Sequence, residues 1–148
     1  MRKVTRTTIL LASVEDVWRL LQRPDTLIFV SAPILKFKPL GQALPEVWAE
    51  GDYEVLLRFL GIVPLGRQTI GVRFEPAEDG TRRMRDAGHG QLAKTWDHLI
   101  TVAPEGEGTR YTDEVTIDAG WLTGAVAFFA GLFYAHRQRR WRKLLARR

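Results

Sequence analysis

The chain has 148 residues, of which 45% are hydrophobic and 26% are charged. This composition excludes a disordered or fibrous chain and is typical of one globular domain with a sizeable core. Cysteine is absent, which excludes disulfides, thiolate nucleophiles and cysteine-ligated metals. The formal net charge of +5 is concentrated from Arg137 onward, where seven cations occur without an acid, so the rest of the chain carries 15 cations against all 17 acids. The slightly acidic body disfavours nucleic acid as a partner.

The N-terminal third predicts a strand followed by two short helices. Residues 4–12 are rich in threonine and isoleucine and predict the strand. Ser13 is a helix N-cap candidate, with acidic residues in the first turn after it, and Pro24 ends this helix and opens a second one through Val30. The four apolar residues 9–12 are too few for a signal-peptide core, so we expect a cytoplasmic protein.

The middle of the chain predicts a series of β-strands separated by glycine-containing turns. Glycines at 61–66 and 88–90 are expected to form bends and are candidate gates. Apolar and polar residues alternate along the strands, which predicts an antiparallel sheet with one apolar face. The expected strands are residues 34–39, 47–60, 67–75, 81–87, 94–102 and 109–119.

The uncharged run from Ala119 to Ala135 passes directly into the basic C-terminus. One interpretation is a short membrane span with a positively charged flank. The alternative is a long helix, residues 121–145, that covers the apolar face of the sheet. We favour the helix, because 17 residues is the lower limit for a span and the sheet needs a cover.

The motifs after residue 83 are similar to those of a known superfamily. They are Met84-Arg85-Asp86, Gly90, Trp96-Asp97-His98-Leu99-Ile100, Gly108-Thr109, Asp113-Glu114-Val115, and a last helix with Phe133, Tyr134, His136 and Arg137. In this order they resemble the polyketide cyclase/dehydrase-like branch of the START-like (SRPBCC) superfamily, although Gln91 stands where that branch usually has proline. The resemblance covers nearly the whole chain.

The resemblance implies an α+β helix-grip fold over residues 1–148. In this fold a curved antiparallel sheet of six to seven strands wraps around a long C-terminal helix, and two short helices follow the first strand. It further implies a single START-like ligand-binding domain with an elongated apolar cavity rather than one particular chemistry. The leading hypothesis is therefore binding or transport of a small hydrophobic molecule, such as a lipid, isoprenoid, quinone or polyketide. No metal or cofactor is expected.

A histidine and two aspartates are predicted to face the cavity. If Trp96 and Ile100 face inward, the two-residue period of a strand carries His98 inward as well. The same reasoning places Asp113 and Asp86 inside, with His98 opposite Asp113 or Glu114. These residues are the candidate catalytic groups of the alternative hypothesis, a cyclase, aromatase or dehydratase. A buried hydrogen-bonded pair without a catalytic role is the reading we favour.

Aromatic and apolar residues on the same faces complete the predicted site. The predicted ligand-binding residues are Phe29, Tyr53, Val55, Leu57, Trp96, His98, Tyr111, Asp113, Phe129 and Phe133. A third hypothesis is transient association with an anionic membrane surface. The cations expected to contact that surface are Arg137, Arg139, Arg140, Arg142 and Lys143. Arg137 is also a candidate to pair with a carboxylate at the cavity end.

Overall fold

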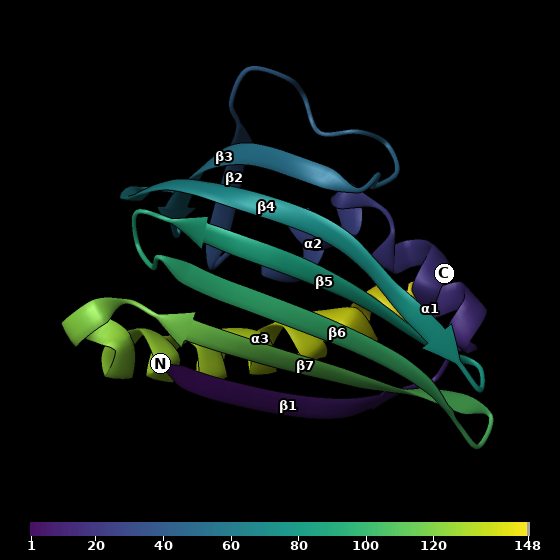
Figure 1. Ribbon diagram of the computed structural model, residues 1–148. Helices are drawn as coiled ribbons and strands as arrows, with labels where there is room; N and C mark the ends of the chain where they lie inside the picture. The colour runs from purple at the N-terminus through teal and green to yellow at the C-terminus, as the bar shows by residue number, and fades with distance from the viewer. Residues whose placement is uncertain (148) are drawn as a thin grey trace.

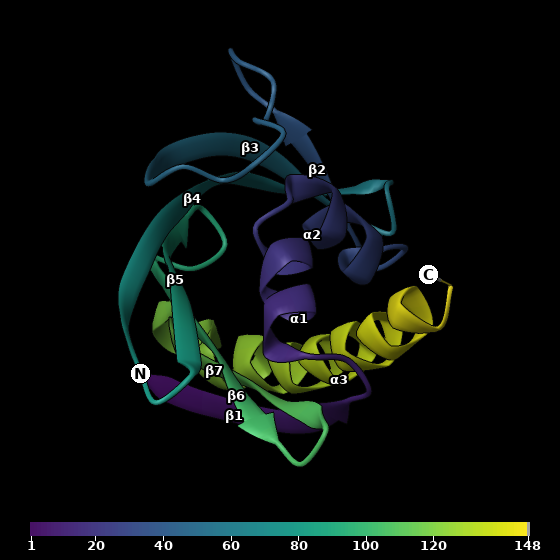
Figure 2. The same cartoon turned by 90° about the vertical axis from the view of Figure 1, so that its right-hand side faces the viewer.

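The computed structural model describes residues 1–147, apart from the side chain of Ala77. Seven strands form one antiparallel sheet in the order β1-β7-β6-β5-β4-β3-β2. The sheet curls around helix α3 (Thr123–Ala146), as Figure 1 and Figure 2 show. This is the predicted helix-grip arrangement. The strands are β1 (Arg2–Leu10), β2 (Leu35–Pro39), β3 (Gly51–Phe59), β4 (Val63–Glu78), β5 (Thr81–Gly90), β6 (Thr95–Glu105) and β7 (Gly108–Asp118).

Two short helices, α1 (Val14–Leu21) and α2 (Pro24–Ser31), connect the two edge strands of the sheet. The hydroxyl oxygen of Ser13 accepts a hydrogen bond of 3.1 Å from the amide of Asp16, which confirms the predicted N-cap. Pro24 is the first residue of α2, where its missing N–H costs no helical hydrogen bond. Both helices lie on the open side of the curled sheet, opposite its convex face (Figure 2).

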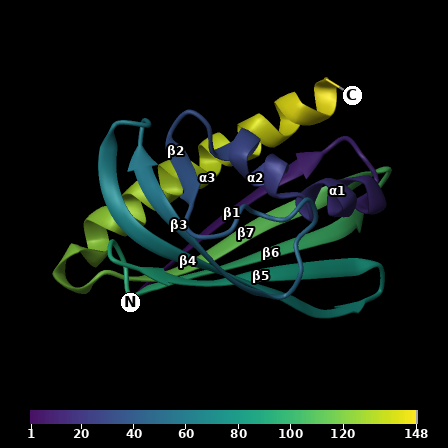
Figure 3. The ribbon, with the colours of Figure 1, turned by 90° about the horizontal axis from the view of Figure 1, so that it is seen from above.

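Helix α3 crosses the strands diagonally and is preceded by a 3₁₀ turn, η1 (Gly120–Leu122) (Figure 3). Its buried residues recur at three- and four-residue steps, so that one face of the helix meets the sheet. That face includes three side chains with polar atoms, Arg137, Gln138 and Trp141, in the C-terminal half. The sheet-facing side of the helix is therefore apolar near its start and partly polar beyond Tyr134. Within the described residues no helix is long and apolar enough to cross a membrane.

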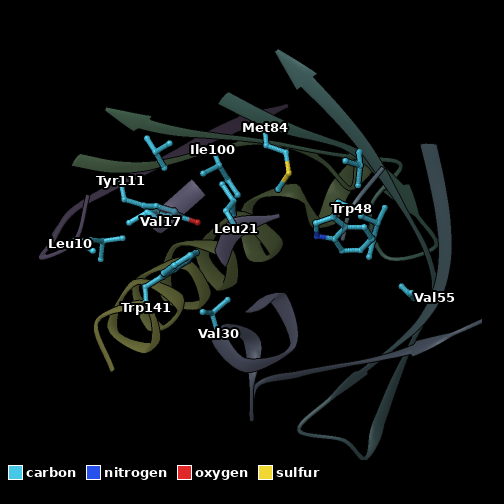
Figure 4. Close-up of a cluster of buried hydrophobic side chains, with 14 of the residues drawn as sticks. Leu10, Val17, Leu21, Val30, Trp48, Val55, Met84, Ile100, Tyr111 and Trp141 are labelled. Atoms are coloured by element: carbon cyan, nitrogen blue, oxygen red, sulfur yellow. The ribbon is translucent and has the colours of Figure 1, made fainter. Parts of the chain in front are cut away.

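One cluster of the core is packed between the sheet, α1, α2 and the second half of α3, and a second one packs Val126, Ala130 and Phe133 of α3 against Val115 and Ile117 of β7. Figure 4 shows Met84 and Ile100 projecting from the sheet toward Leu21 of α1, with Val30 of α2 and Trp141 of α3 on the other side. These side chains come from elements far apart in the sequence. The walls of the cavity described below are therefore formed only when the sheet, the helix pair α1 and α2, and helix α3 are packed together.

Several glycines predicted to form bends lie inside strands. Gly61 lies in the turn between β3 and β4, as predicted. Gly66 belongs to β4, and Gly88 and Gly90 belong to β5, so the second predicted gate is strand. A Cβ at Gly88 would come within 2.7 Å of the Trp96 carbonyl oxygen, and one at Gly90 within 2.4 Å of the Arg67 carbonyl oxygen. Glycine is used here for close approach between neighbouring strands rather than for a turn. Residues 47–50, predicted as strand, precede β3.

Candidate ligand-binding cavity

Two small chambers lie in the interior between the concave face of the sheet and the helices. Each has a volume of about 50 Å³, which is room for about two water molecules. Both chambers are lined mostly by apolar side chains. The first extends toward α1 and α2, where Leu21, Val30 and Trp48 line it, and the second toward Phe129 and Phe133 in the first half of α3. The residues common to both are Leu27, Ile70, Asp86, His98 and Arg137.

An open apolar groove continues the second chamber toward the surface. Its volume is about 190 Å³, and it lies between the start of α3, the end of β3 and the start of β4. Leu92 and Phe129 line both the groove and the second chamber. These two side chains therefore separate the interior from the groove.

His98 and Asp113 form a buried pair on neighbouring strands. His98 Nε2 lies 2.6 Å from Asp113 Oδ1, and the two side chains are 4% and 1% exposed. The register pairs His98 with Val115, so Asp113 lies two residues further along the same face of the sheet. Glu114, the other predicted partner, faces the opposite side, where it pairs with Lys3. Because side chains alternate along a strand, Asp113 and Glu114 lie on opposite faces of the sheet.

Gln138 of α3 completes this polar cluster. Its Nε2 donates to Asp113 Oδ2 at 3.0 Å and to the carbonyl oxygen of Arg6 at 2.9 Å. Burial lowers the pKa of His98, and this outweighs the opposing effect of Asp113. A neutral His98 with its proton on Nε2 donates to Asp113 and leaves Nδ1 as an acceptor. The cluster ties β6, β7, β1 and α3 together.

Asp86 stands beside His98 in the register of β5 and β6. Its Oδ1 accepts a hydrogen bond of 2.8 Å from the amide of Gly71 on β4. Burial raises the pKa of Asp86 to about 7, against the opposing effects of that amide and of Arg137. A carboxyl group with such a pKa changes charge near neutrality. Asp86 is therefore a carboxyl group in the wall of both chambers whose charge depends on pH near neutrality.

Arg137 is buried on the sheet-facing side of α3, with 5% of its surface exposed. Its guanidinium lies near the rings of Phe133 and Tyr134, with the central carbon 5.2 Å from the Tyr134 centroid. Among the described residues it forms no ion pair with a carboxylate, and its Nε has no hydrogen-bond partner. Surface contact between Arg137 and a membrane, which the basic tail suggested, is therefore wrong. The reason is helical spacing, since position 137 lies one turn beyond Phe133 on the buried face.

The remaining cations of the tail are differently placed. Arg140 donates from Nε to the carbonyl oxygen of Phe29 at 3.1 Å, and its guanidinium carbon lies 4.0 Å from the centre of the Phe29 ring. Arg142 donates to the Thr8 hydroxyl at 2.7 Å. Arg139 is exposed. Two of the predicted surface cations are thus engaged in contacts within the chain.

Five of the predicted ligand-binding residues line a chamber. They are Leu57, Trp96, His98, Phe129 and Phe133. Asp113 lies behind His98, and Tyr111 packs against Trp141 with ring centroids 5.3 Å apart. Contact of these residues with a ligand stays a prediction.

The other three predicted residues lie away from both chambers. Val55 is fully buried in the core. Tyr53 packs against Trp48, and its hydroxyl donates to the Ala49 carbonyl at 2.7 Å. Phe29 lies under Arg140 and lines a hollow on the outer surface. Residues at core spacing thus divide between cavity wall and packing according to the tilt of each element, which spacing alone does not determine.

Two residues of α3 that were not among the predicted site residues position the polar cluster. Gln138 holds Asp113, and Tyr134 accepts a hydrogen bond of 2.9 Å from Trp96 Nε1. The Tyr134 ring also lies 4.6 Å from the His98 ring, centre to centre. The available signal was the four-residue step between 134 and 138, which places both on the buried face of the helix.

Fold and cavity together define a START-like helix-grip domain with a small, mostly apolar interior and a polar group at its centre. The chain belongs to the family described as Domain of unknown function (DUF8410), whose model matches residues 8–145. No curated protein matches the sequence.

Solved structures share the fold at low sequence identity. The protein CV1439 from Chromobacterium violaceum is similar with a TM-score of 0.68 and 16% identity over 97% of both chains. The hypothetical protein jhp0584 from Helicobacter pylori has a TM-score of 0.69 and 12% identity, covering 97% of this chain and 87% of its own. A START superfamily protein from Mycobacterium smegmatis has a TM-score of 0.63 and 12% identity over 98% of this chain and 97% of its own. At these identities the likeness establishes the fold alone.

Proposed function

We propose that this protein binds a small, largely apolar molecule in the two chambers between the sheet and α3. The observation that carries the proposal is the pair of apolar chambers that meet at Asp86, His98 and Arg137. Apolar pockets with a few convergent polar groups are the usual form of small-molecule sites. The START-like fold supports the same conclusion, because it places an interior cavity between sheet and helix.

The size of the interior limits the ligand. The chambers together offer about 100 Å³, which corresponds to about three water molecules. A single aromatic ring or a short acyl chain fits this space. A longer isoprenoid or lipid chain fits only if it continues past Leu92 and Phe129 into the groove. We infer that the ligand enters by this route, because the two side chains line both spaces.

Filling the cavity tests the proposal. Ile70 lines both chambers and is 5% exposed, so Ile70→Phe places a ring where the chambers meet. We expect this variant to remain folded, because the added atoms occupy existing space, and to lose the ligand. The matched control is Leu132→Phe on the outer face of α3, where the side chain is 55% exposed. Equal ligand binding by both variants would place the site elsewhere.

A second candidate function is proton transfer by His98. The observation that favours it is the 2.6 Å contact between His98 and Asp113 in the wall of both chambers. Asp113 would keep the proton of His98 on Nε2. Nδ1 of the neutral imidazole would then act as general base on a substrate bearing a carbonyl group. His98→Gln would then abolish turnover and leave binding intact. Loss of binding and turnover in parallel would contradict a catalytic role and leave the histidine as a structural or ligand-orienting group.

A further inference from the structure

Three buried polar groups gather at one end of the first chamber, with a single neutral oxygen as the acceptor among them. Arg137 Nε, Trp141 Nε1 and the Tyr111 hydroxyl form no hydrogen bond of good geometry within the described part of the chain. The Tyr111 oxygen nevertheless lies close enough to Arg137 and Trp141 that both act against the rise in its pKa that burial causes. Arg137 and Trp141 line the first chamber, and Tyr111 packs directly against Trp141. Buried polar atoms in folded proteins almost always have partners. One neutral tyrosine oxygen does not balance a buried guanidinium and an indole N–H, so a further acceptor group belongs there.

The nearby acids do not supply that acceptor. Asp113 already accepts a hydrogen bond from Gln138 and contacts His98. Asp86 accepts a hydrogen bond from the amide of Gly71. Neither acid forms an ion pair with Arg137. Burial removes most of the hydration of the Arg137 guanidinium. Among the described residues no carboxylate forms an ion pair with it, so its charge also lacks a close counter-ion. A neutral acceptor such as water would satisfy the hydrogen bonds but not this charge.

We propose that Arg137 and Trp141, with Tyr111 behind them, form an anion-recognition site for the carboxylate of an otherwise apolar ligand. This inference rests on the proposed function, since it names the class of molecule that the cavity binds. The planar fork of a guanidinium matches a carboxylate, and the indole N–H adds a donor. The small first chamber favours a planar carboxylate over a bulkier tetrahedral phosphate.

The apolar body of the ligand has a defined direction from this site. Arg137 lines the second chamber as well as the first, and the second chamber is lined by Phe129 and Phe133. A carboxylate on Arg137 therefore leaves its apolar portion in the second chamber, pointing toward the groove beyond Phe129. Such a ligand is amphipathic, with its anionic end innermost.

Matched probes separate this inference from the proposed function. Hydrocinnamate and hydrocinnamyl alcohol share a phenylpropyl body and differ in the charged group. Isothermal titration of the full chain near neutral pH should show the carboxylate binding about 10- to 100-fold more tightly, as expected for hydrogen bonds to a charged group. Sodium acetate, which has the same anion without the apolar body, should bind far more weakly.

The variant Arg137→Met removes the cation while keeping an unbranched side chain. It should reduce affinity for hydrocinnamate about 10- to 100-fold and change affinity for the alcohol less than about threefold. Arg139→Met, on the exposed face of the same helix, removes an equal charge and should change neither. A measurement on the unaltered protein accompanies these variants. The Trp141 indole N–H resonance should move downfield with hydrocinnamate and not with the alcohol.

Four results of these measurements would contradict a part of the proposal. Equal binding of acid and alcohol to the unaltered protein would overturn the anion site and leave apolar binding intact. Acetate binding as tightly as hydrocinnamate would show a free-anion site and overturn the apolar body. Binding of neither aromatic probe would overturn the proposed function for ligands of this size, and the anion site with it. An unmoved Trp141 resonance in the presence of bound acid would remove this residue from the site.

Discussion

Asp86→Asn should stabilise the protein in a pH-dependent manner. The pKa of Asp86 is raised from 3.8 to about 7 in the folded protein, so the folded state binds more protons than the unfolded state between about pH 4 and 7. The free energy of unfolding therefore falls as pH rises through this window. Three pKa units correspond to at most about 4 kcal/mol. We expect about half of this, because the side chain keeps partial solvent contact. Asparagine removes the charge and retains the oxygen that accepts from Gly71.

Denaturant unfolding at pH values from about 4 to 8 measures this effect. The variant and the unaltered protein should have equal stability near pH 4, and the variant should be more stable by about 2 kcal/mol near pH 8. Asp79→Asn is the control, because this residue is exposed on the turn between β4 and β5 and asparagine also tolerates its positive φ of 54°. A stability difference that is constant with pH, or a variant less stable at pH 8, would refute the assigned burial effect.

Three further predictions concern packing and hydrogen bonding. Gln138→Met should cost about 1–3 kcal/mol, because it removes the donor from Asp113 and from the Arg6 carbonyl, whereas Gln42→Met in an exposed loop should be neutral in the same urea titration. Gly88→Ala should lower the midpoint of thermal unfolding, since its Cβ would press on the Trp96 carbonyl at 2.7 Å. By contrast, Gly131→Ala should stabilise by about 0.5–1 kcal/mol, because it lies in a helix interior with ordinary contacts around the new methyl group. A harmless alanine at Gly88, or a harmful one at Gly131, would contradict the strand and helix packing described above.

Strand alternation was sufficient to place the polar pair. The two-residue period carries His98 and Asp113 inward with their apolar neighbours, and the structure buries both. The N-cap at Ser13 and the helix start at Pro24 depend on local chemistry and were likewise predictable. Features set by one or two neighbouring residues can be inferred from sequence because no distant element changes them.

Features that depend on distant elements could not be predicted in this way. Gly88 looked like a turn residue, but its role is set by the approach of Trp96 on the next strand. Arg137 looked like part of a solvated basic tail, because arginine is rarely buried without a counter-ion. Its burial follows from how α3 crosses the sheet. The chamber volumes depend in turn on the directions in which side chains point from the sheet, from α1 and α2, and from α3.

Native mass spectrometry of the purified protein, with extraction of any bound molecule, tests the central claim most directly. The account predicts one small apolar adduct per chain in the unaltered protein and in Leu132→Phe, and none in Ile70→Phe. An adduct retained equally by Ile70→Phe would contradict binding in the chambers, as would a protein that carries no adduct and binds neither hydrocinnamate nor hydrocinnamyl alcohol.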